Sequence, residues 1–289
     1  MSKLLKILAL VLSAALCISS SAEAQGVPPV IRPTPDSAVV QITLADGSKI
    51  VGRITAVTDT EVQVESSFGH TVLRRNSIVS IVEHSTDSLH QGEVWPEDPS
   101  RTRLLFAPTG RMLRSGEAYF TDAYILFPGF QLGVSDNFSL GGGASIIPGV
   151  NPLDQFYFLT PKLGVYSSPR VNFAVGALVG GAMNINSPVG IAYGVGTYGG
   201  EDNSVTAGVG YAFAGTDAKS SALLMIGGST RLTRNTALVT ENYLYTGDGT
   251  GIVSGGVRFI GDRISVDLAL GANPSSGIPV PYLAFIYKL

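Results

Sequence analysis

The sequence predicts an all-β protein: a C-terminal antiparallel transmembrane β-barrel of about 12 strands, preceded by a small five-stranded β domain. Three observations support this prediction. Aliphatic side chains alternate with small or polar ones in many short segments, of which residues 264–270 and 205–213 are clear examples. This period of two is imposed on a strand that lies between an apolar and a polar environment. The number of such segments is even, and tight turns alternate with longer connections, as in bacterial outer-membrane barrels.

The composition of the 289-residue chain fits this class. It is 45% hydrophobic, which does not suit a disordered chain, and only 14% charged, which is low for a soluble protein. The formal charge of −3 argues against a nucleic-acid partner recruited by net charge. Beyond the N-terminus no segment is long and apolar enough for a membrane helix, so a membrane location requires strands.

Residues 1–24 are predicted to be a secretory signal peptide. Two lysines precede a short apolar core at residues 7–18, and an Ala-x-Ala cleavage motif ends at Ala24. The alternative is lipoprotein processing at Cys17, which the bulky Leu16 before it disfavours. Cleavage after Ala24 leaves a mature protein without cysteine, which excludes a disulfide framework and thiol chemistry.

A proline-rich linker is predicted at residues 25–37, followed by the small β domain at residues 38–86. Asp46-Gly47 is a strong hairpin signal within that domain. Its expected strands are residues 39–44, 50–57, 61–66, 70–74 and 78–82. This succession of strands and turns resembles Sm-like and SH3-like small barrels over some 45 residues. Its four cations, taken as solvated charges or as a patch for an anionic partner, are Lys49, Arg53, Arg74 and Arg75.

Residues 87–116 are predicted to be a linker that leads into the barrel. His84, His90, Glu93 and Asp98 lack the spacing of metal ligands, so no metal site is expected. The basic and apolar stretch at residues 101–111 is expected to pack under the barrel, the alternative being that it folds partly into the lumen.

Residues 117–289 are predicted to be the barrel. Most strands have about 9–12 residues, the length that crosses a bilayer when tilted. The expected strands are 117–127, 129–134, 138–147, 156–167, 171–183, 190–199, 204–213, 221–232, 236–245, 251–260, 264–271 and 279–288. Aromatic residues near strand ends, the candidates for an interfacial girdle, for the core or for the lumen, are Tyr119, Phe127, Phe130, Phe138, Tyr157, Tyr198, Tyr243 and Tyr282.

The last strand resembles the terminal signal by which outer-membrane barrels are recognised for insertion. Leu283, Phe285, Tyr287 and Leu289 alternate to the C-terminus, with Leu where the signal usually has Phe. Residues 101–149, with Arg-Thr-Arg-Leu-Leu-Phe-Ala-Pro-Thr-Gly-Arg and Ser-Asp-Asn-Phe-Ser-Leu-Gly-Gly-Gly, resemble outer-membrane β-barrel proteins of Bacteroidota-like bacteria. That resemblance implies a location and a fold, and it supplies no activity and no catalytic residues.

Enzymatic activity is not expected. Barrel phospholipases and barrel proteases need an imidazole that moves a proton near neutral pH. His70, His84 and His90 all precede the barrel, so no catalytic residue and no cofactor is predicted. The charged residues that the alternation turns into the lumen are Asp122, Lys162, Arg231, Glu241, Arg258 and Asp267. They are interpreted either as ion pairs that satisfy one another or as the groups that set the selectivity of a narrow pore.

The functional expectation is a non-catalytic outer-membrane barrel, either structural or a narrow passive channel for small solutes. The alternative is a membrane-anchored binding protein whose periplasmic β domain contacts cell wall or a protein partner. A soluble β-protein that binds an apolar ligand is disfavoured by the aliphatic outer face. The expected partners are outer-membrane lipids, the barrel-insertion machinery and that periplasmic partner, with no nucleic acid.

Overall fold

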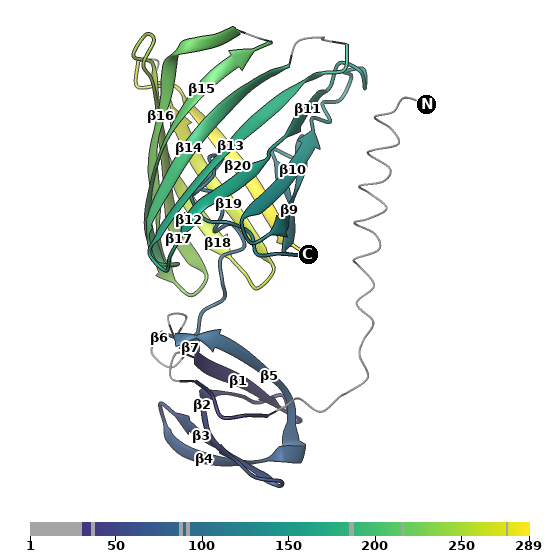
Figure 1. Ribbon diagram of the computed structural model, residues 1–289, viewed down its shortest axis with the longest axis vertical. Helices are drawn as coiled ribbons and strands as arrows, with labels where there is room; N and C mark the ends of the chain where they lie inside the picture. The colour runs from purple at the N-terminus through teal and green to yellow at the C-terminus, as the bar shows by residue number, and fades with distance from the viewer. Residues whose placement is uncertain are drawn as a thin grey trace. The chain divides into compact units, whose positions relative to one another are not determined.

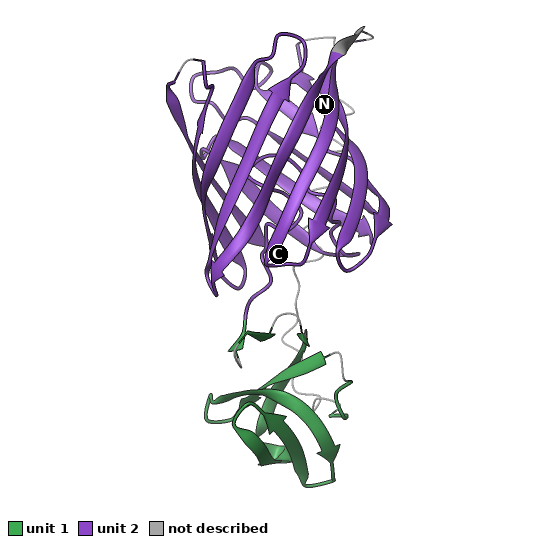
Figure 2. Cartoon of the chain, turned by 90° about the vertical axis from the view of Figure 1, so that its left-hand side faces the viewer, with its two compact units in different colours: residues 1–94 green, residues 95–289 purple. Residues whose placement is uncertain are grey.

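The computed structural model describes residues 31–35, 38–86, 89–90, 93–184, 188–215, 217–275 and 277–289. Two compact units divide the chain after Val94, and they are coloured separately in Figure 2. The predicted signal peptide, with its Cys17, lies outside the described residues. Among the described residues, no helix has the length and apolarity to cross a membrane.

The first unit is built on a five-stranded antiparallel sheet of order β4-β3-β2-β1-β5. Its strands are β1 Ala38–Leu44, β2 Lys49–Val57, β3 Glu61–Ser66, β4 Gly69–Arg74 and β5 Ile78–Ser85, with a 3-10 turn, η1 Arg75–Ser77, before β5. Ile42, Val62 and Val64 form a fully buried core. Part of the predicted linker joins this core, because Ile31 packs on it and the backbone of Thr34 bonds to Ile54.

Two of the four cations of this unit lie opposite acidic residues in the sheet. The strand register sets Arg53 opposite Glu65 and Arg74 opposite Glu61. A short hairpin, β6 Leu89–His90 with β7 Glu93–Val94, follows the sheet.

The second unit is a closed antiparallel barrel (Figure 1). Its strands are β8 Ala118–Ala123, β9 Phe127–Ser135, β10 Phe138–Ala144, β11 Phe156–Leu159, β12 Lys162–Ser167, β13 Val171–Ala182, β14 Val189–Gly199, β15 Asn203–Ala214, β16 Asp217–Thr233, β17 Thr236–Tyr245, β18 Gly251–Ile260, β19 Ile264–Ala272 and β20 Pro279–Lys288. Pairing of β20 with β8 closes the ring. β11 and β12 form one strand interrupted next to Pro161, which has no N–H to donate. The prediction of an all-β chain with a twelve-stranded antiparallel barrel is therefore confirmed.

The outer face of the barrel is a band of exposed apolar side chains. Its members include Phe173, Val175, Val205, Val209, Leu224, Ile226, Leu238, Phe259, Leu268 and Leu283. Exposed apolar patches of this extent do not occur on ordinary soluble monomers. A closed barrel of tilted strands with such a band is the architecture of a transmembrane β-barrel.

The first hairpin of the barrel differs from the prediction. β8 ends at Ala123 rather than at residue 127, and residues 124–126 form the turn. Tyr124 and Ile125 have φ of 58° and 63°, a conformation that bulky residues rarely adopt. The turn is hidden by its apolar side chains, whereas Pro128, the break between the two expected strands 117–127 and 129–134, lies inside β9.

Candidate functional site in the barrel interior

The chain that precedes β8 folds inside the barrel. We call residues 95–116 the plug segment. Leu104, Leu105 and Ala107 are 1%, 2% and 4% exposed, and they pack on inward side chains such as Val195 and Val239. The structure thus realises the second of the two placements considered for residues 101–111, and the expectation that they only pack under the barrel was wrong. Apolar burial inside the lumen is the reason.

A tight hairpin forms the inner end of the plug segment. Arg103 and Pro108 form a backbone bridge, and Leu104 N donates to Ala107 O at 2.8 Å. Two N–H groups of the turn, those of Phe106 and Ala107, both donate to Glu241 Oε2 at 2.9 Å. Glu241 on β17 therefore caps the turn as a charged acceptor, which is stronger than a neutral one.

Arg258 on β18 fixes the same hairpin from another side. Its Nε donates to Asp267 Oδ1 at 2.6 Å, and its Nη1 donates to Asp98 Oδ2 at 2.9 Å. Its Nη2 donates to Leu104 O and to Asp267 Oδ2. Asp267 also accepts from Arg103 at 3.1 Å. Two wall residues and two plug residues thus alternate in charge, so each buried charge has an opposite partner.

Two further wall cations bind carbonyl groups of the plug segment. Lys162 Nζ donates to Arg111 O at 2.5 Å, and Arg231 Nη1 donates to Pro96 O at 2.8 Å. The guanidinium of Arg231 also lies over the ring of Trp95, 5.2 Å from its centre, a cation–π contact. Trp95 is half-buried beside this cation.

Five of the six predicted lumen charges thus hold the plug segment. The sixth, Asp122, was assigned to the wrong face. It pairs with Phe285 in the strand register, whereas the neighbouring Ile286 and Ala284 are buried inward. Asp122 accepts a hydrogen bond from Phe127 N at 3.2 Å, across the unexpected turn.

Neutral wall residues add contacts that the sequence did not reveal. Thr197 Oγ1 accepts from Gly110 N at 2.8 Å, and Tyr282 Oη donates to Leu105 O at 2.8 Å. Tyr119, Tyr243 and Tyr282, candidates for the interfacial girdle, all face inward. The alternation in β17 and β20 could have assigned Tyr243 and Tyr282 to the inner face. Tyr243 is two residues from the inward Glu241, and Tyr282 is four residues from the inward Ile286.

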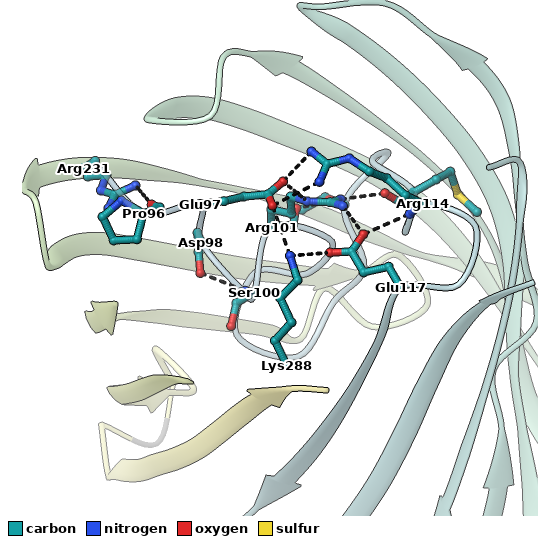
Figure 3. A network of polar contacts seen from close by, with 11 residues as sticks. Pro96, Glu97, Asp98, Ser100, Arg101, Arg114, Glu117, Arg231 and Lys288 are labelled. Atoms are coloured by element: carbon teal, nitrogen blue, oxygen red, sulfur yellow. Dashed lines mark hydrogen bonds and ion pairs between the residues drawn. The ribbon is translucent and has the colours of Figure 1, made fainter. Parts of the chain in front are cut away.

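A network of ion pairs joins the plug segment to the last strand at the short-turn mouth of the barrel (Figure 3). Glu97 Oε1 accepts from Arg101 at 2.7 Å and from Arg114 at 2.8 Å. Lys288, in the last strand, donates to Glu97 at 3.2 Å and forms an ion pair with Glu117 at 3.1 Å. Glu117 also accepts from Arg101 and from the backbone N of Arg114. We call these five residues the mouth network. It ties both ends of the plug segment to the C-terminus of the barrel.

The mouth network predicts a loss of stability in acid. Burial alone would raise the pKa of Glu97, but Arg101, Arg114 and Lys288 outweigh it and hold the pKa at about 2. Because the folded pKa is depressed, the stabilisation is complete above the unfolded pKa of about 4.5 and is lost as the pH falls toward 2. The shift corresponds to roughly 3 kcal/mol. Urea unfolding of wild type and Glu97→Gln between pH 7 and pH 2.5 measures it.

The expected result is that Glu97→Gln is less stable at pH 7 and loses less stability than wild type on acidification. An unchanged pH dependence in the variant would show that Glu97 is not the titrating group. Glu93→Gln is the matched control, because Glu93 is exposed in the first unit.

The described residues contain no group of three His, Cys, Asp or Glu side chains placed to hold a metal ion. His70, His84 and His90 lie in the first unit.

Comparisons with known proteins give a limited likeness. No known family and no curated protein matches the chain. Among solved structures, the chain is similar to the KdgM porin, with a TM-score of 0.47 and 8% identity over 60% of this chain and 99% of that one. A loop-deletion mutant of OmpT, an outer membrane protein of Vibrio cholerae, matches with a TM-score of 0.33 and 12% identity over 88% of this chain and 97% of that one. Such scores assign neither a family nor an activity.

Proposed function

We propose that this protein is a non-catalytic outer-membrane β-barrel protein whose lumen is closed by its own plug segment. In this proposal the barrel is a membrane anchor, and the small β domain is the part that meets a partner in the periplasm, either cell wall or a protein. The observation that carries the proposal is that Lys162, Arg231, Glu241, Arg258 and Asp267 all bond to the plug segment. Charged side chains that are bonded to the plug segment in this way are not free to interact with ions passing through the lumen.

The outer membrane is the location that the barrel geometry supports. Only closed barrels and helices satisfy the backbone within a bilayer. The plug segment begins at the mouth formed by the tight turns, since Arg231, which bonds to Pro96, is next to the turn of Arg234 and Asn235. Short turns of such barrels face the periplasm. The small β domain, which directly precedes Trp95 in the chain, is therefore proposed to be periplasmic.

Conductance in planar lipid bilayers tests whether the barrel is closed. The intact protein is expected to give no steady current, because the plug segment fills the lumen. A variant that lacks residues 97–114 is expected to conduct, and its heat-modifiable migration on a gel verifies that the barrel still folds. A current through the intact protein equal to that of the deletion variant would refute the closed barrel.

A gated narrow channel is the second candidate function. It is favoured by the way the plug segment is held at the mouth, where charged residues form a network that acid and salt weaken. A current that appears reversibly when the intact protein is brought from pH 7 to pH 3 would favour this channel. A barrel that stays closed over that range would favour the anchor.

A further inference from the structure

A cavity of about 330 Å³ lies at the short-turn mouth of the barrel, beside the mouth network. One of its walls is the end of the plug segment, which contributes Arg111 and Met112. Three tight turns of the barrel form the facing wall, through Asp136, Pro169 and Glu201. This volume is at the lower end of the range for ligand sites in proteins, so the cavity suits a small molecule.

The charges that line the cavity balance one another. The lining contains three arginines and three carboxylates, which are Arg101, Arg111, Arg114, Glu97, Asp136 and Glu201. Arg101 and Arg114 are both ion-paired with Glu97. Among the described residues, Arg111 forms no ion pair, and Glu201 forms neither an ion pair nor a hydrogen bond. The cavity therefore presents one cation and one anion that are not engaged with opposite charges of the protein.

Arg111 carries donors that the protein does not use. Its Nη2 donates to Gly199 O at 3.3 Å and to Gly200 O, which fixes the guanidinium beside the turn that carries Glu201. Its Nε and Nη1 donate to no described residue and are not sealed from solvent. Burial lowers the pKa of Arg111, and Glu201 offsets this only in part, as expected for a cation without a close anion. Free N–H groups of a guanidinium are strong donors for a carboxylate.

Asn172, at the start of β13, adds a further donor to the same cavity. The residue is only 8% exposed, and its Oδ1 accepts from Ser167 Oγ at 2.8 Å. Its Nδ2 donates to no described residue and is not sealed from solvent. Because buried polar groups ordinarily have hydrogen-bond partners, an acceptor on a ligand suits this position. The cavity thus offers donors for a carboxylate and, at the exposed Glu201, an acceptor for an ammonium group.

We propose that this cavity binds a small zwitterion with one carboxylate and one ammonium group, of the size of an amino acid or a dipeptide. Arg111 and Asn172 hold the carboxylate, and Glu201 holds the ammonium group. A ligand with a single charge would leave either Arg111 or Glu201 without a partner in the complex, which costs affinity. The site goes beyond the proposed function, because it does not depend on whether the barrel conducts or on what the small β domain meets.

Saturation-transfer NMR on the full-length protein in nanodiscs tests the site, with glycylglycine as the zwitterionic probe. A saturable signal is expected from glycylglycine. Acetate, ethylammonium and succinate, which each lack one of the two charged groups, are expected to bind at least about tenfold more weakly, the loss of one charged hydrogen bond. Equal binding of acetate and glycylglycine would show a simple anion site and overturn the proposal. The absence of a saturable signal from glycylglycine would also overturn it.

A charge reversal sharpens the test, because Glu201 makes no contact that holds the fold. Glu201→Lys is expected to lose glycylglycine binding and to gain succinate binding, since the new ammonium group complements a second carboxylate. Arg111→Gln is expected to weaken glycylglycine binding by about tenfold or more. Asp262→Lys, on an exposed turn outside the cavity, is the matched control. Wild-type binding of glycylglycine to Glu201→Lys, with gel mobility that verifies a folded barrel, would refute the site.

Discussion

Arg258→Ala is expected to lower the free energy of unfolding by about 3–5 kcal/mol, the cost of removing one partner from a buried ion pair. Arg258 is 1% exposed and bonds to Asp267, to Asp98 and to Leu104 O. Its removal leaves Asp98 without this partner and Asp267 with Arg103 alone. The loss is measured by urea unfolding in detergent, followed by gel mobility of unheated samples.

Two matched variants separate the causes of this effect. Arg258→Lys keeps the charge but cannot donate to three groups in the same fixed geometry, so an intermediate loss is expected. Arg263→Ala, at an exposed turn, is expected to change the free energy of unfolding by less than about 0.5 kcal/mol. If Arg258→Ala were as stable as Arg263→Ala, the buried network would not hold the plug segment.

The sequence predicts the barrel well because the period of two extends over most of residues 117–289. A strand that separates lipid from lumen must alternate, so Arg258 and Asp267 could be assigned inward from their neighbours alone. The assignment of residues to the inner or outer face by alternation fails where the position of a turn is predicted wrongly. Asp122 lies near the end of β8, and that end was hidden by the apolar residues Tyr124 and Ile125 in positive φ. Its assignment inward was therefore wrong.

The plug segment could not be predicted in the same way. Its backbone has no regular period, and its wall contacts join residues that are far apart in the chain, such as Leu104 with Arg258. From the sequence, the inward charges of mixed sign were interpreted either as ion pairs with one another or as groups that line a pore. The structure shows that some of their partners are backbone groups of the plug segment, for example the N–H of Phe106 on Glu241. Backbone donors and acceptors are the same in every sequence, so residue types cannot reveal this pairing.

Gly110→Ala is the second large effect that we expect, and it changes no charge. Gly110 lies where the plug segment touches β13 and β14, and its N donates to Thr197 Oγ1 at 2.8 Å. A Cβ at this position would lie 2.1 Å from Asn172 O and 3.0 Å from Thr197 N. Because the obstacles are strand backbone, they cannot rotate away, and the plug segment must shift instead. We expect a loss of about 3 kcal/mol, the upper range for overpacking, and a current through bilayers that wild type lacks.

Gly194→Ala is the matched control, because a Cβ on Gly194 of β14 would meet nothing within 4 Å. It is expected to keep wild-type stability and a closed barrel. A current in Gly110→Ala together with a closed Gly194→Ala would show that close backbone docking, and not charge alone, keeps the lumen shut. Wild-type stability and no current in Gly110→Ala would contradict the docking of the plug segment on β13.

Combining Gly110→Ala with Arg258→Ala extends the test. Both changes act on one docked segment, so their effects should fall short of additive once the first has displaced it.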